Sequence, residues 1–123
     1  MGKTVTTASI EEKIAGVYYI NAGQAIAAQN RIYVDGHQAE LNLVTICIIV
    51  LKNGFKVEGV SACVDPANYD EQKGQECAYE NAFEKLWQLE GYLLKEDMYQ
   101  AEQTTAQLAD FQLDGCESGA CKL

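Results

Sequence analysis

The chain has 123 residues, and its 18 acidic side chains against 9 lysines and arginines give a net charge of −9. Residues 1–64 hold five basic and five acidic side chains, whereas residues 65–123 hold four basic and thirteen acidic ones. A binder of duplex nucleic acid needs a basic surface that displaces counterions from phosphates, and anionic membranes attract the same kind of surface. DNA binding as the main activity is therefore close to excluded, and membrane binding is disfavoured.

Length and composition predict one globular domain. The hydrophobic fraction of 48% and the charged fraction of 22% are ordinary for such a chain. The longest apolar run, residues 43–51, is far shorter than the roughly 20 residues that span a bilayer. We expect an α+β domain over residues 1–109 and a polar C-terminal tail over residues 110–123. The five cysteines are odd in number and form no CxxC motif, which favours a reducing cytoplasm.

The first predicted element is a short helix near the N-terminus. The segment Ser9–Glu12 matches a capping box, in which Ser9 would cap a helix that runs to about Ala15. The aromatic and β-branched residues of Gly16–Ile20 favour an extended chain. The segment Arg31–Val34 is a candidate short strand that precedes a turn at Asp35–Gly36.

The clearest pattern is a β-hairpin. The run Leu43–Leu51 is apolar on both faces and rich in β-branched residues, which predicts a strand covered on both sides by helices or by a partner subunit. The run Phe55–Val60 alternates apolar and polar residues. Asn53–Gly54 between them predicts a two-residue type I′ turn, in which both central residues need positive φ. The expected architecture is an antiparallel, hairpin-centred sheet packed with helices.

The second half reads mainly as helix. Asp65 followed by Pro66 is typical of an N-cap and a first helical residue. The composition predicts a helix over Asp70–Trp87, with an interruption near Gly74. Gly91 breaks the pattern, and a further helix is expected over Lys95–Leu108. Cys47, Cys63 and Cys77 fall in segments that read as core.

Catalytic signals are sparse. No HExxH, GxSxG, GxxxxGK or GxGxxG motif occurs. The single histidine, His37, follows a turn, where a solvated side chain is commoner than a general base or a metal ligand. Cys116 and Cys121 are better explained as free thiols of the tail than as half of a metal site. We expect no enzyme, no metal and no cofactor, with a small nucleotide-cleaving enzyme as an alternative.

Binding is better supported, because amides stand beside aromatic residues. One group of such a pair can stack on a nucleobase while the other reads its edge. Phe83 and Trp87 are better explained as core residues. The candidate pairs are Asn53 with Phe55, Asn68 with Tyr69, and Asn81 with Phe83.

Residues 43–95 carry a series of short motifs. They are Thr45-Ile46-Cys47, Leu51–Phe55, Gly59–Val64, Pro66, Asn68-Tyr69-Asp70, Gly74, Glu80-Asn81-Ala82, Leu86-Trp87 and Leu89–Tyr92. In order and spacing these motifs resemble a family of small phage proteins, the gene-49 and gene-66 products. In length and character the chain is also similar to a family of Thoeris anti-defence proteins, phage or prophage inhibitors of bacterial immunity.

The resemblance implies a protein that binds cyclic ADP-ribose isomers made by TIR-domain enzymes and holds them without cleavage. It implies dimers that assemble into larger homo-oligomers with nucleotide pockets between protomers, in the cytoplasm of the infected bacterial host. Relatives also bind cyclic oligonucleotides at a separate site. Because Arg31 is the single arginine, an arginine clamp for that second ligand would have to be replaced or absent here.

The hypothesis is therefore sequestration of a cyclic nucleotide signal by a homo-oligomer. An acidic phage protein that inhibits a host protein by direct binding is the alternative from another class. If sequestration is right, cations of the first half should lie near the pocket, and the acidic residues of the second half should form a solvated face. The candidate ligand contacts are Arg31, Lys52, Asn53, Phe55, Tyr69, Asn81 and Lys85.

Overall fold

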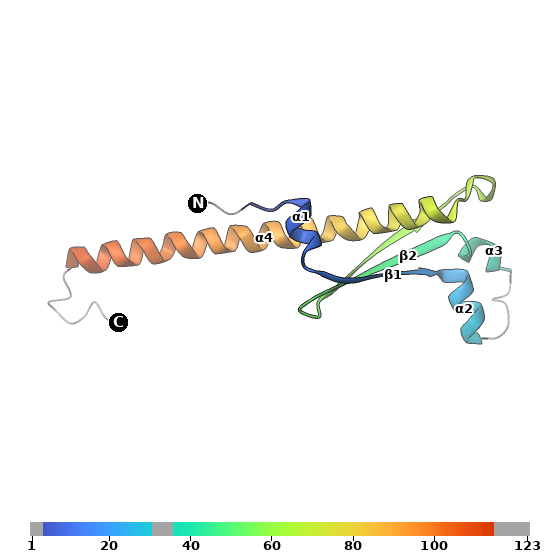
Figure 1. Cartoon of the computed structure of the whole chain (residues 1–123), viewed down its shortest axis with the longest axis horizontal. Helices are drawn as coiled ribbons and strands as arrows, with labels where there is room; N and C mark the ends of the chain where they lie inside the picture. The colour runs from blue at the N-terminus through green and yellow to red at the C-terminus, as the bar shows by residue number, and fades with distance from the viewer. Residues whose placement is uncertain (1–3, 31–35, 115–123) are drawn as a thin grey trace.

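A computed structural model of the chain describes residues 4–30 and 36–114. Three antiparallel strands form one sheet in the order β1-β2-β3, and the long helix α4 lies along one face of it (Figure 1). This architecture is the α+β fold that the sequence predicts. The candidate strand Arg31–Val34 lies outside the described residues. The elements in chain order are α1 (Thr7–Glu11), β1 (Ile14–Asn21), α2 (Ala22–Asn30), α3 (Gln38–Leu41), β2 (Val44–Leu51), β3 (Lys56–Ala62), the 3-10 helix η1 (Pro66–Asn68) and α4 (Glu71–Asp114).

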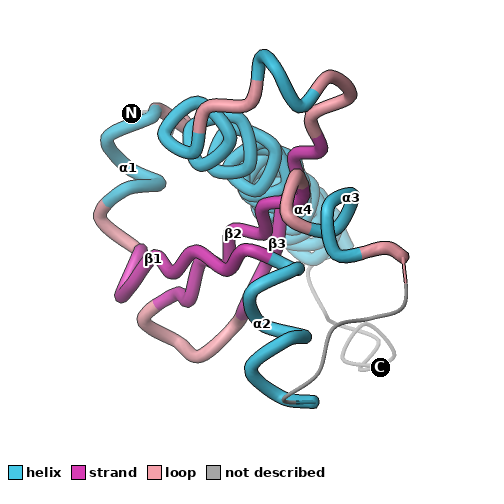
Figure 2. Tube along the Cα trace, turned by 90° about the vertical axis from the view of Figure 1, so that its right-hand side faces the viewer, coloured by secondary structure: helices cyan, strands magenta, loops and turns pink. Residues whose placement is uncertain are grey.

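The core lies between the sheet and α4. In β2, alternate residues from Thr45 to Leu51 are buried, because successive side chains of a strand point to opposite faces. Cys47 and Ile49 are fully enclosed and belong to one cluster with buried residues of the first half of α4. The strands and α4 lie against each other in Figure 2. The sequence-based assignment of Phe83 to the core is confirmed. The buried cluster comprises Ile10, Cys47, Ile49, Leu51, Val57, Ala78, Ala82, Phe83 and Leu86.

The hairpin is confirmed, but its turn differs from the expected type I′ form. The amide of Gly54 donates to the Leu51 oxygen, and the Leu51 amide donates to the Phe55 oxygen, both over 2.8 Å. The loop is therefore the three-residue segment 52–54, and Gly54 has a φ of 93°. A three-residue hairpin loop ends on a residue in the left-handed region, where glycine is free of strain.

The second half forms one continuous helix rather than two. α4 continues without a break through Gly74. Glycine fits here because the Thr45 hydroxyl occupies the space beside it: a Cβ on residue 74 would lie 2.9 Å from Thr45 Oγ1. Gly91 lies on an open stretch and does not end the helix. Asp70 caps α4 by accepting from the Gln72 amide at 2.9 Å, and Asp65 caps only the short η1. Asn68 and Tyr69 therefore precede the long helix instead of starting it.

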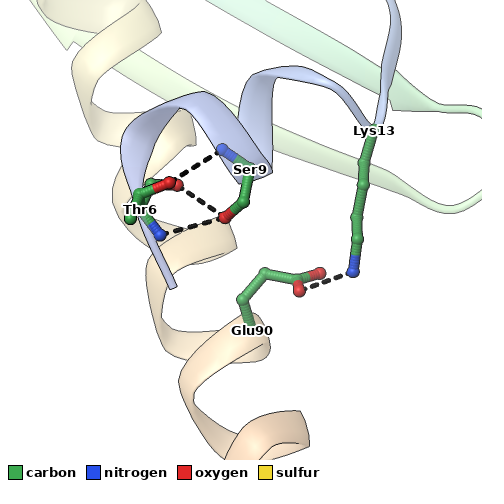
Figure 3. A network of polar contacts seen from close by, with 4 residues as sticks. All are labelled: Thr6, Ser9, Lys13 and Glu90. Atoms are coloured by element: carbon green, nitrogen blue, oxygen red, sulfur yellow. Dashed lines mark hydrogen bonds and ion pairs between the residues drawn. The ribbon is translucent and has the colours of Figure 1, made fainter. Parts of the chain in front are cut away.

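The N-terminal helix is capped one turn earlier than expected. Thr6 is the N-cap, and it exchanges hydrogen bonds with Ser9, which stands at the third helical position (Figure 3). α1 ends at Glu11, and the extended chain begins at Ile14. Lys13 Nζ lies 2.7 Å from Glu90 Oε1, which ties the start of β1 to α4 (Figure 3).

The face of the sheet opposite α4 is largely open. Tyr18 pairs with Ile48, and Ile20 pairs with Ile46, which is opposite Val60 on β3. Tyr18, Ile20 and Val60 are 59%, 37% and 48% exposed. Within the described chain, helices therefore cover only one face of β2, and of the two covers expected for this strand only a partner subunit is left for the other face. We call Tyr18, Ile20, Ile46, Ile48 and Val60 the open sheet face.

Beyond the sheet, the second half of α4 projects alone past the hairpin turn (Figure 1). The whole of α4 has 44 residues, which corresponds to a length of about 66 Å at the rise per residue of an α-helix. α4 reaches Asp114, inside the segment that the sequence assigns to a tail, and residues 115–123 lie outside the description. No described helix is both long enough and apolar enough to span a membrane.

Candidate functional site

A cleft of about 230 Å³ opens where the sheet ends and α4 begins. One wall comes from the residue before β2 and from the end of β3, and the other comes from the first turns of α4. The segment after η1 closes the cleft between these walls. The lining residues are Leu43, Ser61, Ala62, Cys63, Asn68, Tyr69, Asp70, Lys73, Gly74 and Cys77.

Tyr69 supplies the aromatic side chain of the cleft. Its backbone is extended, with φ −68° and ψ 132°, because η1 ends there and α4 has not yet begun. The Tyr69 hydroxyl lies 3.5 Å from Nδ2 of Asn21, and the same nitrogen donates to the Asn42 oxygen at 2.7 Å. Gly74 leaves room beside the ring, since a Cβ there would lie 3.9 Å from Tyr69 Cε1. The ring is therefore contacted at its hydroxyl end by Asn21, while the space at Gly74 lets α4 approach its edge.

Two capping carboxylates order the polar residues around this ring. Asp65 accepts from the Ala67 amide at 3.0 Å and from the side-chain amide of Asn68 at 3.2 Å. Asp70 caps α4, which directs the first turn of that helix and Lys73 toward the cleft. Lys73 forms no ion pair with any residue of segments 4–30 and 36–114. The cleft thus combines a ring face, an ordered amide and one unpaired ammonium group.

Two thiols also line the cleft. Cys63 is half-buried, and its sulfur lies 3.2 Å from the Asp65 carbonyl oxygen. Cys77 is exposed, so the expectation that it belongs to the core is wrong: it lies at the cleft, beside the end of β3, rather than beneath the sheet. Among the described residues, no three His, Cys, Asp or Glu side chains gather as metal ligands would.

The predicted contacts do not form one cluster. Lys52, Asn53 and Phe55 lie at the hairpin turn, while Tyr69 lies beyond the opposite ends of the same strands. Seven residue pairs separate these ends, which corresponds to about 20 Å at the rise of a strand. The Asn53 side chain accepts from the Phe55 amide at 2.9 Å, so it shapes the turn. Arg31 lies outside the described residues.

Asn81 and Lys85 lie between these two ends and bind the edge of the sheet. The Asn81 side chain donates to the Val60 oxygen at 2.8 Å. Lys85 Nζ lies 3.1 Å from Glu58 Oε2, and both side chains are substantially exposed. Both residues fasten β3 to α4. His37 is exposed with its Nδ1 3.5 Å from Glu40 Oε1, which confirms the expected solvated side chain.

Sequence reasoning found Tyr69 but missed Ser61 and Lys73 as its neighbours. Asn68 was noted only as the partner of Tyr69. The antiparallel register places Ser61 opposite Thr45, which itself contacts the helix at Gly74. The sequence around Ser61 does not indicate that this hydroxyl lies near the start of α4. The Asp65 and Asp70 caps were the available signal, since two caps in succession mark a sharp change of chain direction.

A comparison with known protein families identifies the family of this chain. The model of the phage protein (N4 Gp49/phage Sf6 gene 66) family matches residues 5–98. The chain belongs to this family. The match covers all three strands and the packed half of α4. It is therefore broader than residues 43–95, where the short motifs lie.

No curated protein and no solved structure matches the chain. The cleft beside Tyr69 lies wholly within the matched segment, because its lining residues run from Leu43 to Cys77. The projecting end of α4 beyond residue 98 lies outside that segment.

Proposed function

We propose that this phage protein binds cyclic ADP-ribose isomers made by TIR-domain enzymes and sequesters them without cleavage. It would act as a Thoeris anti-defence protein, of the kind called Thoeris anti-defence protein one, in the cytoplasm of the infected host. The cleft beside Tyr69 carries the proposal. A ring face can stack on adenine, the Asn68 amide and the Ser61 hydroxyl can read polar edges, and Lys73 can meet a phosphate.

The size of the cleft supports a pocket shared between protomers. Sites for drug-sized ligands have volumes of about 300–1,000 Å³. At about 230 Å³ the cleft accommodates one part of a cyclic ADP-ribose isomer, such as its adenine. The remaining sugar and phosphate groups would then contact a second copy of the chain. Sequestration of this kind requires binding groups alone.

The open sheet face supports self-association into dimers and larger homo-oligomers. Its members are apolar or aromatic, and three of them are well exposed in a single copy. Contiguous exposed apolar surface of this kind usually marks an interface. The excess acidic residues lie in residues 65–123, so they add no charge to this face. On the same face Glu58 stands opposite Ile48, and its carboxylate pairs with Lys85, so a second copy would meet a paired carboxylate there.

Isothermal titration with the purified product of a TIR-domain enzyme tests the proposal. We expect a stoichiometric complex, and intact ligand should be recovered after the protein is denatured by heat. Recovery of cleaved ligand would favour the nucleotide-cleaving alternative. Absence of binding at high micromolar concentrations would refute sequestration.

Matched variants test whether the cleft is the site. Tyr69→Ala should weaken binding about tenfold or more, because stacking on one base is worth about 1–3 kcal/mol. Tyr92→Ala removes an equivalent ring from an exposed position of α4 and should leave affinity unchanged. Lys73→Gln should weaken binding most at low salt, whereas Lys95→Gln should not. Equal effects of Tyr69→Ala and Tyr92→Ala would place the ligand elsewhere.

One observation favours direct inhibition of a host protein as a second candidate function. The projecting half of α4 exposes apolar side chains among acidic residues, as a helix that docks into a groove would. Pull-down with host lysate and with a variant truncated after residue 90 would distinguish the two. Loss of capture together with retained nucleotide binding would assign this function to the helix. The apolar side chains are Leu93, Met98 and Leu108, with Tyr92 and Tyr99 beside them.

A further inference from the structure

A second hollow, larger than the cleft, lies between α1 and the first half of α4. Its volume is about 310 Å³. Three aromatic side chains and three carboxylates line it, and none of the lysines and histidines among the described residues does. We call it the aromatic groove. Its aromatic members are Tyr79, Phe83 and Trp87, and its carboxylates are Glu11, Glu80 and Glu84.

The three rings form a continuous wall. They stand four residues apart on α4, a spacing that places side chains on one face of a helix. The Tyr79 and Phe83 centroids are 5.6 Å apart with an interplanar angle of 34°, and those of Phe83 and Trp87 are 6.3 Å apart at 75°. Phe83 is buried in the core, while the two outer rings are half-buried. The two outer rings are therefore partly accessible to a ligand, while the buried Phe83 ring fixes the part of α4 that carries them.

The field in the groove is negative. Burial and the nearby Glu11 carboxylate, in that order, raise the pKa of the Tyr79 hydroxyl. In the described part of the chain, none of the three groove carboxylates forms an ion pair. An anion such as a nucleotide phosphate would be repelled here, so this groove cannot be the anion site proposed above.

The α1 wall of the groove is anchored. The reciprocal Thr6–Ser9 hydrogen bonds fix the start of the helix that carries Glu11 (Figure 3). The Lys13–Glu90 pair holds the end of this segment against α4 (Figure 3). Ile10, between these anchors, is only 1% exposed. The backbone that carries Glu11 is thus fixed beside the ring wall before any ligand arrives.

We infer that the aromatic groove binds an aliphatic ammonium group, with its charge over the face of one outer ring, Trp87 or Tyr79, and its N–H groups donating to the rim carboxylates. Ammonium groups bind the faces of aromatic rings within about 6 Å of the centroid, and tryptophan is the strongest partner. The carboxylates select an ammonium that retains N–H donors. The ligand class is a small alkylamine, and a lysine side chain of a second copy has the same chemistry.

Putrescine, a dication with two primary ammonium groups, is the probe. Trp87 is the single tryptophan of the chain, so its fluorescence reports binding directly. We expect saturable quenching by putrescine. Mg²⁺, which carries the same charge but gives up its bound water reluctantly, gains little from the ring faces and should bind at least about tenfold more weakly. If Mg²⁺ displaces putrescine at equal concentration, attraction to bulk negative charge explains the binding and the inference is wrong.

Variants separate the groove from the general acidity of the chain. Glu84→Gln should weaken putrescine binding about fivefold. Glu102→Gln removes the same charge from an exposed position of α4 outside the groove and should have almost no effect. Equal losses in the two variants would overturn the site. Trp87→Leu should weaken putrescine binding about three- to tenfold, as measured by calorimetry. If Trp87→Leu does not fold, Tyr79→Leu is the second variant.

Light scattering with and without putrescine distinguishes the two sources of the ammonium. An unchanged mass means that the groove takes a free amine. A fall in mass means that putrescine displaces a lysine of a second copy, and either result retains the site. Nucleotide affinity of the Glu84→Gln variant should equal that of the wild type. The proposal of the amine site and the proposal of the nucleotide site can therefore be refuted independently.

Discussion

Gly59 of β3 lies directly against the backbone of α4 at Ala82. A methyl group on Gly59 would overlap the Ala82 nitrogen and the Ala78 oxygen. Both are backbone atoms of a buried helix turn, so neither can move aside as a flexible side chain would. The sheet and α4 are therefore in contact without an intervening side chain, and this close approach sets the height of the helix above Cys47.

Gly59→Ala should therefore destabilise the protein. We expect the free energy of unfolding to fall by about 3 kcal/mol, because overpacking forces the backbone apart. Urea denaturation followed by circular dichroism measures the change. Gly91→Ala is the control: nothing lies within 4 Å of its added methyl group. It should raise stability by about 0.5–1 kcal/mol, through the lower entropy of its unfolded chain. A Gly59→Ala variant as stable as the wild type would contradict the contact.

Asn81→Ala tests whether Asn81 is structural, as its hydrogen bond to the Val60 oxygen indicates. Loss of that bond should lower the free energy of unfolding by about 1 kcal/mol. Nucleotide affinity should remain unchanged, because Asn81 does not line the cleft. Gln103→Ala, on the projecting part of α4, should change neither quantity. A large loss of affinity with normal stability would restore Asn81 as a ligand contact.

The sequence predicted the elements whose signals are local. The apolar, β-branched run of β2 and the alternation of β3 identified both strands, and Asp65 was correctly predicted to be a cap. The turn type was missed because Lys52 joined the loop, which the Asn53–Gly54 pair alone does not reveal. The two expected breaks in α4 were wrong, since packing overrides the weak helix propensity of glycine at Gly74.

The candidate site was harder to predict because it depends on contacts between distant segments. Tyr69 was found from its neighbouring amide, yet its partners Ser61 and Lys73 are set by the strand register and by the helix cap. The prediction that cations of the first half lie near the pocket rested on the charge distribution alone. Lys52 instead lies at the far end of the strands, so the described cleft has Lys73, from the acidic half, as its cation.

Ile20→Lys tests self-association through the open sheet face. An ammonium group at the centre of an apolar interface should raise the dissociation constant at least about a hundredfold, because burying an unpaired charge is costly. Analytical ultracentrifugation measures the mass. Leu108→Lys adds the same charge on the projecting part of α4 and should leave the assembly intact. If Leu108→Lys alone dissociates it, then α4 rather than the sheet holds the copies together.

Stability should fall in alkaline solution through Cys47, which is fully enclosed between β1, β2 and α4. Burial raises the pKa of its thiol above 9.0, and a hydrogen bond with Tyr19 opposes this shift in part. The folded thiol therefore keeps its proton at a pH where the unfolded thiol has lost it. Because the folded state binds more protons, the free energy of unfolding is constant below about pH 9 and declines above it.

Tyr19 adds to this decline, since burial, followed by the charge of Cys47, raises the pKa of its hydroxyl. Thermal melts between pH 7 and pH 10.5 should show a steeper loss of Tm above pH 9 in the wild type than in Cys47→Ala. The absolute Tm of that variant will be lower because of the cavity, so the slope is the informative quantity. Cys77→Ala removes an exposed thiol and should keep the wild-type slope. Equal slopes in all three proteins would show that the Cys47 proton does not contribute.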